Sequence, residues 1–208
     1  MPGEIFVITA PSGTGKTTLL QALLAADPRL QFSISYTTRP PRPGEVSGKD
    51  YFFVSPQEFQ RLRQEGALVE WVEQFGYGYG TSRDWVLKTV ETGADLVFDL
   101  DPQGARALKN EFPQATYIFI LPPSPEALKQ RLQARGHLKP AELKRRLQQG
   151  QAELKEVHRY DFLVINDDFP QALEQLKAII QAARCRTSRL WPQLAPRFTP
   201  DQGGKQMN

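Results

Sequence analysis

A short run near the start of the chain has residue types and spacing that are typical of phosphate binding: Ala10-Pro11-Ser12-Gly13-Thr14-Gly15-Lys16-Thr17-Thr18. Its glycines allow the backbone to curl so that the N–H groups point toward an anion. Lys16 is placed to reach the β- and γ-phosphates of a nucleoside triphosphate, and the Thr17 hydroxyl to bind Mg²⁺. Ala10 replaces the first glycine of the motif G-x-x-x-x-G-K-[ST], but it is small enough for the turn. An ordinary strand-to-helix turn is the alternative interpretation.

The segments on either side of this run are those that a phosphate-binding loop requires. Residues 5–8 are apolar and predict a short buried strand, and residues 19–24 belong to an amphipathic helix. The positive end of that helix would point at the same anion.

Two acids follow another apolar run. Residues 94–101 read as a buried parallel strand that ends at Asp99 and Asp101. The carboxyl end of such a strand can reach Mg²⁺, and we expect Asp99 to do so through a water molecule.

Two groups of arginines are further candidates for phosphate contacts. Arg39 and Arg42 lie in residues 37–45, where three prolines hold the chain extended. Arg131, Arg135 and Arg146 lie in a pair of helices interrupted at residues 136–140, which is typical of a lid that closes over phosphates. The alternatives are a solvated basic loop and an ordinary surface hairpin of helices.

The order of the remaining segments predicts the fold class. Apolar strands, including residues 32–36, 116–121 and 161–167, alternate with amphipathic helices, so we expect a three-layer α/β sandwich with a mostly parallel sheet. Residues 75–82 read as a loop of glycines and aromatics. Ligands should bind at the carboxyl ends of the strands, near Ala10, Asp99 and Asn166.

Composition narrows the function classes. The net charge of the chain is only +3, and the basic residues are scattered along the sequence, which disfavours nucleic acid as a partner. No apolar run approaches the roughly 18 residues of a membrane span, and the first residues do not resemble a signal peptide. The single cysteine, Cys185, agrees with a reducing compartment, so we expect a cytoplasmic protein without a membrane partner.

Taken together, these motifs resemble the guanylate kinase family from residue 5 to about residue 183. The matching runs are A-P-S-G-T-G-K-T-T, S-x-S-x-T-T-R-P-P-R-P-G-E, G-K-D-Y-F-F, L-V-E-W, Y-G-T-S-R, D-L-D-x-Q-G-A, R-L-x-x-R-G and V-I-N-D-D. The run from Ser33 to Glu45 is the most specific, since many nucleotide-hydrolysing families share G-K-T.

The resemblance implies an enzyme that transfers a phosphoryl group from ATP to GMP, with Mg²⁺, in guanine nucleotide synthesis and GMP recycling. It implies a core of the P-loop NTP hydrolase type (residues 1–34, 82–130 and 152–184). A mixed α/β GMP-binding insert (35–81), a helical lid (131–151) and a flexible tail (185–208) would complete the chain. dGMP would be a weaker substrate, and the chain would act as a monomer or homodimer.

The resemblance also assigns roles to residues. Arg39, Arg42, Tyr51 and Tyr79 would hold the GMP phosphate, and Ser35, Glu70, Thr81 and Asp101 would read the base. Asn166 and Asp167 would join the residues from Ala10 to Thr18 in binding ATP. Lys16, Arg131, Arg135 and Arg146 would carry catalysis, and Thr17 and Asp99 would hold the metal.

The sequence departs from the family pattern at three places. Pro102 directly follows Asp101, and residues 137–140 and Gly150 lie in the expected lid, so these positions concern the contacts of the lid and of the segment around Asp101. Two rival functions remain at this point. One is a non-catalytic guanylate-kinase-like module that binds protein partners, although such modules typically lose the lysine that is kept here as Lys16. The other is a kinase for another small phosphorylated acceptor.

Overall fold

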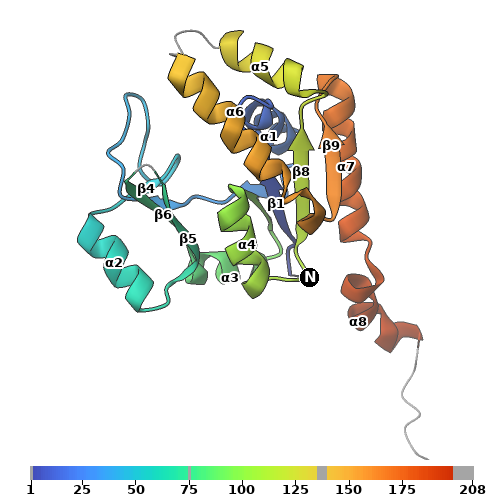
Figure 1. Ribbon diagram of the computed structural model, residues 1–208. Coiled ribbons are helices and arrows are strands. Elements are labelled where there is room, and N and C mark those ends of the chain that lie inside the picture. Colours follow the sequence, from blue (N-terminus) through green and yellow to red (C-terminus); the bar gives the residue numbers. More distant parts are fainter. Residues whose placement is uncertain (1, 75, 135–139, 199–208) are drawn as a thin grey trace, which may run out of the picture.

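The computed structural model describes residues 2–74, 76–134 and 140–198. Its central sheet has five parallel strands in the order β2-β7-β1-β8-β9 (Figure 1). They are β1 (Ile5–Thr9), β2 (Leu30–Phe32), β7 (Asp95–Asp99), β8 (Thr116–Leu121) and β9 (Phe162–Ile165). The interiors of the three middle strands are apolar and buried because helices cover both faces of the sheet.

Helices form a layer on each side of this sheet. Leu19 and Leu23 of α1 (Lys16–Ala26) pack in one core with Leu176 of α7 (Phe169–Arg184). Val86 of α3 (Arg83–Glu91) and Leu108 of α4 (Pro102–Glu111) pack in a second core on the opposite face. The predicted three-layer α/β sandwich with a mostly parallel sheet is therefore confirmed.

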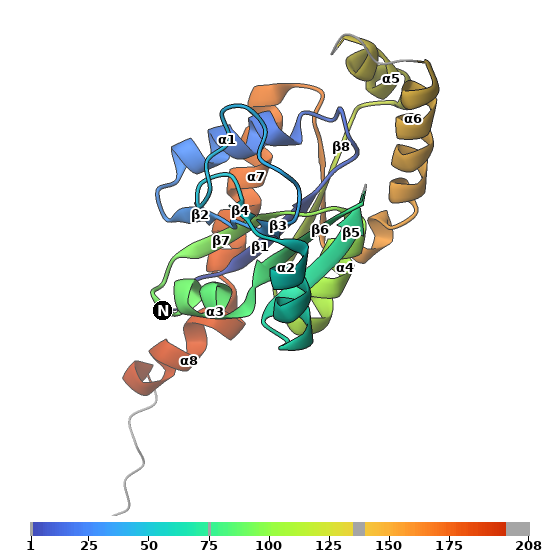
Figure 2. The same ribbon diagram turned by 90° about the vertical axis from the view of Figure 1, so that its left-hand side faces the viewer.

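A second, mixed sheet lies beside the first, in the order β4-β3-β6-β5 (Figure 2). β3 pairs in parallel with β4, whereas β6 is antiparallel to both β3 and β5. Its elements are β3 (Tyr36–Thr37), β4 (Phe52–Phe53), α2 (Pro56–Gln64), β5 (Leu68–Gln74) and β6 (Tyr77–Ser82).

Two predictions about this region are wrong. The single strand expected over residues 32–36 is divided, because the chain leaves the central sheet after Ser33 donates to Val97 O (2.9 Å) and enters the second sheet at Tyr36. The loop expected over residues 75–82 is strand β6 from Tyr77. A Cβ at Gly78 would lie 2.6 Å from the Phe59 ring, so here glycine permits close packing of a strand.

The helices α5 (Pro125–Ala134) and α6 (Pro140–Leu154) lie near the carboxyl ends of β1 and β8 (Figures 1 and 2). The 3₁₀ turn η1 (Val157–Arg159) connects α6 to β9. Arg135 and residues 136–139, where we expected the hinge of a lid, are outside the described residues.

The end of α7 is attached to the core by a buried ion-pair network. Arg184 is 7% exposed and donates through Nε to Asp95 Oδ2 at 2.6 Å, and its guanidinium also pairs with Asp27. Asp95 in turn accepts the Glu4 backbone N–H at 2.6 Å. This network joins α7 to β7 and to the segment between α1 and β2.

The segment after residue 184 differs from the flexible tail that we expected. Residues Thr187–Phe198 form helix α8, in which the Trp191 and Phe198 rings stack 6.3 Å apart, and Arg189 pairs with Glu4 at 3.2 Å. Residues 199–208 lie outside the described part. Within the three described ranges, no helix has both the length and the apolar character needed to cross a bilayer.

Candidate active site

Two cavities adjoin at the carboxyl ends of β1 and β7. The first, of about 320 Å³, is lined by residues 10–17 and one face of α6, and we call it the loop cavity. The second, of about 270 Å³, is lined by residues of the second sheet and by residues 99–101, and we call it the insert cavity. Gln74 and Asp101 line both, so ligands in the two cavities would meet at these residues.

The loop cavity is shaped by the glycine-rich run between β1 and α1. Gly15 precedes α1 with a φ of 92°, and a Cβ at that position would lie 2.6 Å from Asn166 Nδ2. Asn166 is buried and donates through this nitrogen to Thr14 O at 2.7 Å. Asn166 thus holds the loop in this structure, and its contact with ATP stays a prediction. Asp167 is exposed and does not belong to the lining of the loop cavity.

Lys16 and Asp99 form an ion pair across this site, with side chains 18% and 27% exposed. Thr17, at the start of α1, lines the loop cavity, whereas Asp99 lines the insert cavity. Thr18 is exposed and is not among the lining residues. Among the described residues no group of three or more His, Cys, Asp or Glu side chains could enclose a metal ion. One hydroxyl and one carboxylate do fit Mg²⁺, which commonly keeps waters and takes other ligands from substrate phosphates.

The inner face of α6 closes one side of the loop cavity. Arg146 donates through Nη1 to Ser12 Oγ (3.2 Å) and through Nε to Glu142 Oε1 (2.7 Å), so it already contacts the glycine-rich run. Arg131 of α5 donates to Asn166 O at 2.8 Å instead of lining either cavity. Arg135, the remaining predicted arginine, is outside the described residues.

A chain of hydrogen bonds at the insert cavity connects three of the predicted base-reading residues. Thr81 donates through Oγ1 to Glu70 Oε1 at 2.7 Å. Ser35 Oγ lies 3.1 Å from Thr81 Oγ1, and because the Thr81 proton is used, Ser35 is the donor. Glu70 is only 3% exposed, and this burial raises its pKa to about 7, with Asp101 adding to the increase and the Thr81 hydrogen bond opposing it.

Asp101 and Gly104 place the segment after β7 next to these hydrogen-bonded side chains. Asp101 caps α4 by accepting the Gly104 N–H at 2.7 Å, with Pro102 as the first helical residue. A Cβ at Gly104 would lie 3.3 Å from Glu70 Oε2, so a side chain here would crowd that oxygen. Asp101 is therefore placed both to cap a helix and to face both cavities.

The predicted phosphate-holding residues divide into two groups. Arg42, Tyr51 and Tyr79 line the insert cavity. Arg39 is 9% exposed and lies behind this wall, 5.5 Å from the Tyr51 ring centroid. Its Nη2 donates to both Glu45 carboxylate oxygens, at 2.8 and 2.9 Å. Arg39 thus holds the proline-rich loop in this structure.

Sequence reasoning missed several residues that line the cavities: Asp50, Gln74, Arg145, Gln149 and Glu153. Helical spacing offered a signal for two of them, because Gln149 and Glu153 lie three and seven residues after Arg146 and share its face. The other positions carry no comparable signal, since which strand ends meet depends on the pairing of the sheets.

Comparisons with known proteins agree on one family. A sequence profile described as guanylate kinase matches residues 3–183. A guanylate kinase of Geobacter sulfurreducens is 44% identical over 199 residues, which cover 96% of this chain and 98% of the relative. One of Hahella chejuensis is 48% identical over 186 residues and 89% of each chain. The crystal structure of guanylate kinase from Anaplasma phagocytophilum superposes with a TM-score of 0.76 at 31% identity, covering 95% of this chain and 96% of that one. The chain therefore belongs to the guanylate kinase family.

Proposed function

We propose that this protein transfers the terminal phosphoryl group of ATP to GMP, giving ADP and GDP. Membership of the guanylate kinase family supports this reaction, and the observation that carries it is the placement of Glu70. Its carboxylate is buried beside Thr81 and Ser35 in a cavity that adjoins a second cavity lined by a glycine-rich, lysine-bearing loop. An acceptor base in the insert cavity would point its phosphate toward that loop.

The chemistry of Glu70 favours guanine over adenine. Guanine presents two adjacent donors, N1–H and the exocyclic amine, and one carboxylate can accept from both. Adenine presents an acceptor at N1, which a carboxylate would repel. The hydroxyls of Ser35 and Thr81 can donate to the guanine O6 when they exchange their present partners. A desolvated site that loses such paired hydrogen bonds discriminates by about 10⁴ or more.

The remaining residues would align and neutralise phosphates. Arg42, Tyr51 and Tyr79 line the insert cavity and would hold the GMP phosphate, and Arg39 would join them by exchanging Glu45 for that phosphate. This acceptor is already ionised near neutral pH, so the reaction requires no general base. Lys16 would leave Asp99 for the ATP phosphates, and Arg146 would reach them from α6.

Mg²⁺ would be held by the Thr17 hydroxyl and, through water, by Asp99. It would neutralise charge on the phosphates of ATP. Arg131 and Arg135 remain proposals for the same task, although Arg131 is bonded to Asn166 O in this structure.

We also propose a division of the chain that follows this chemistry: the core, the insert over residues 35–81 and a lid over residues 131–151. ATP and GMP, or dGMP, are the proposed partners of this reaction, and the chain would act as a monomer or homodimer without nucleic acid or a membrane. The free, exposed Cys185 supports a place in the reducing cytoplasm.

The test is a coupled ATP assay in which GMP, dGMP, AMP, UMP and dTMP are offered separately. We expect strong turnover with GMP, weaker turnover with dGMP and little with the other three. Equal turnover with AMP would contradict the assignment of Glu70. If ADP forms with none of the five acceptors while GMP still binds, the chain is a binding module and the proposed reaction is wrong.

A further inference from the structure

Three polar side-chain atoms are buried next to the loop cavity without a hydrogen bond: Thr9 Oγ1, Glu153 Oε2 and Tyr160 OH. Within the described ranges none of the three has a partner, although buried polar groups are nearly always satisfied. They come from three different elements, since Thr9 ends β1, Glu153 lies in the last turn of α6, and Tyr160 follows η1. Thr9 pairs with Phe119 in the sheet and the Tyr160 ring packs on Phe119, while Glu153 lines the loop cavity with Ala10, so all three groups lie around the end of β1.

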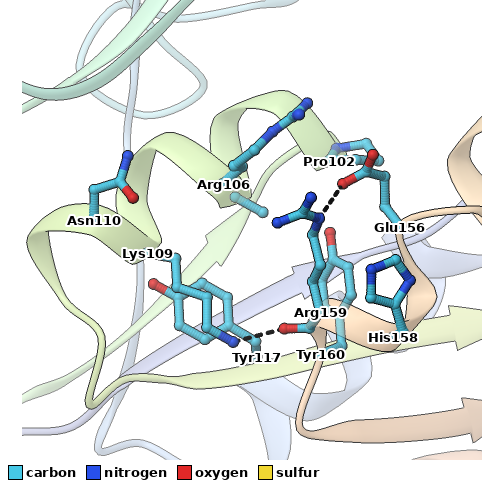
Figure 3. Close-up of a pocket in the computed structure, with 10 residues that line it drawn as sticks. Pro102, Arg106, Lys109, Asn110, Tyr117, Glu156, His158, Arg159 and Tyr160 are labelled. Carbon is cyan, nitrogen blue, oxygen red and sulfur yellow. Dashed lines mark hydrogen bonds and ion pairs between the residues drawn. The ribbon is translucent and has the colours of Figure 1, made fainter.

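Tyr160 is the fixed member of this group. Its ring packs edge-to-face on Phe119 of β8, with centroids 4.9 Å apart. Figure 3 shows it in the wall of a hollow of about 320 Å³ between α4 and η1. Two contacts tie this region together, Lys109 Nζ to Arg159 O at 2.6 Å and the ion pair of Arg159 with Glu156 at 2.7 Å (Figure 3). The Tyr160 hydroxyl is therefore held by the elements around the central sheet and not by the lid helix α6.

Glu153 belongs to the lid helix. It lines the loop cavity with Lys16, and its Oε1 accepts from Gln149 Nε2 at 2.9 Å. Arg146, which contacts Ser12, lies seven residues earlier and about two turns away on the same face of α6. Any group that fixes Glu153 also fixes the direction in which α6 presents Arg146.

The two unpartnered groups are chemically complementary. Burial raises the pKa of Tyr160 to about 12, and Asp101, Glu156 and Glu153 add to this increase, so at neutral pH the phenol keeps its proton and can donate. Burial also raises the pKa of Glu153, while Lys16 opposes that change. Thr9 lies close enough to lower the pKa of Tyr160, but it makes no hydrogen bond of good geometry with that hydroxyl.

We propose that one ordered water accepts a hydrogen bond from the Tyr160 hydroxyl, contacts Thr9 Oγ1 and donates to Glu153 Oε2, and that this link anchors the base of α6. Glu153 and Tyr160 are then positioning residues, which aim Arg146 at the phosphates in the loop cavity. This role rests on the proposed function, because it matters only if a phosphoryl group is transferred there.

The test combines Tyr160→Phe, Glu153→Met and the double variant, with two matched controls. Tyr117→Phe removes a hydroxyl that donates to Phe112 O (3.0 Å) in the wall of the same hollow, and Glu156→Met removes the nearby ion pair with Arg159. We expect kcat to fall roughly tenfold in the three anchor variants, because small losses of alignment slow phosphoryl transfer. The controls should keep kcat within about twofold of the unaltered protein.

Two further measurements separate positioning from stability. The thermal midpoint of the double variant should stay near that of the unaltered protein or rise, because apolar groups replace both buried polar partners. In a double-mutant cycle, Arg146→Ala should reduce kcat less in the Tyr160→Phe background than alone. An unchanged kcat in all anchor variants of an active enzyme, or fully additive effects with Arg146→Ala, would overturn the anchor.

Hydrogen exchange keeps this test independent of the proposed reaction. Amides of α6 should exchange faster in Tyr160→Phe than in Tyr117→Phe. If the unaltered protein shows no GMP-dependent turnover, the proposed function fails, yet faster exchange would still support the anchor. Equal exchange in the two variants would overturn the anchor whether or not the protein is active.

Discussion

Thr81 Oγ1 donates a 2.7 Å hydrogen bond to Glu70 Oε1 in the second sheet, where Glu70 is only 3% exposed. This contact uses one oxygen of the carboxylate, and Gly104 leaves space around the other, Oε2. A buried acid that still has lone pairs to offer is suited to a ligand with two donors.

Glu70→Gln should lower kcat/KM for GMP by about 10² or more, because the amide places a donor where the carboxylate accepts from guanine. Steady-state kinetics with GMP and AMP would measure the change. Thr81→Ser keeps the hydroxyl and serves as the control, with kcat/KM close to that of the unaltered enzyme. An unchanged ratio of GMP to AMP turnover in Glu70→Gln would show that Glu70 does not select the base.

The stability of the free protein should depend on pH through the same group. The pKa of Glu70 is about 7 in the folded chain and near 4.5 when unfolded, so between these values only the unfolded state releases the proton. The free energy of unfolding should therefore fall by about 3 kcal/mol as the pH rises from 4.5 to above 7. Urea titrations across this range would measure it. Glu70→Gln should lack this decrease, and an identical pH profile for both proteins would contradict the prediction.

GMP binding should release a proton near pH 7. The donors of guanine favour the ionised carboxylate, so bound GMP lowers the pKa of Glu70 from its free value of about 7. Calorimetry at pH 7 in two buffers of different ionisation enthalpy should then report release of about half a proton. The proton release should be much smaller in Glu70→Gln, and in the unaltered protein it should fall steadily between pH 7 and about 8.5 as Glu70 ionises before GMP binds. Heats that are independent of buffer would mean that Glu70 is already ionised before GMP binds.

Lys16→Ala should lower kcat by roughly 10² or more while the fold stays intact, because the charge that Lys16 supplies to the phosphates is lost. Lys49→Ala, which removes an exposed lysine of the insert, is the matched control and should leave kcat near its normal value. Circular dichroism would check the fold of both variants. Near-normal turnover of Lys16→Ala would remove the glycine-rich loop from the mechanism.

Gly150→Ala should stabilise the protein by about 0.5–1 kcal/mol, since alanine favours a helix interior. The added Cβ would lie 3.4 Å from Leu128 Cδ2 and 3.6 Å from Pro11 Cβ, which are ordinary contacts. Gly104→Ala is the informative contrast, because its Cβ would lie 3.3 Å from Glu70 Oε2 and should weaken GMP binding. Thermal unfolding and GMP titration of both variants would test this pair. A less stable Gly150→Ala would show that α6 packs more tightly against α5 than these distances indicate.

The sequence predicted best where local chemistry decides the structure. The glycine-rich loop before Lys16 and the apolar strands of the central sheet follow from residue type and spacing. Chain continuity misled at residues 32–36, because the point at which the chain changes sheets depends on the partners β7 and β6.

In the two cavities, too, the sequence predicted many of the residues that are present but not how they contact one another. Motifs identified Glu70, Thr81 and Ser35, but their joining into one hydrogen-bonded chain depends on the pairing of β5 with β6. Arg39 donates to Glu45, and Arg131 donates to the Asn166 carbonyl. Spacing along the chain does not determine these distances in space, so the sequence could not predict either contact. Helix α8 was missed because prolines at 192 and 196 obscured its apolar face.

The family pattern matches the chain only to residue 183, whereas the buried guanidinium that joins Asp27 to Asp95 is on the next residue, Arg184. Trimming an expression clone at the end of the profile match would therefore remove the cation and keep both acids, one of them 3% exposed. Uncompensated buried charge of this kind typically costs about 3–5 kcal/mol, a large part of the stability of an ordinary domain. The smallest self-sufficient folding unit of this protein therefore extends at least one residue beyond the part that the family profile matches.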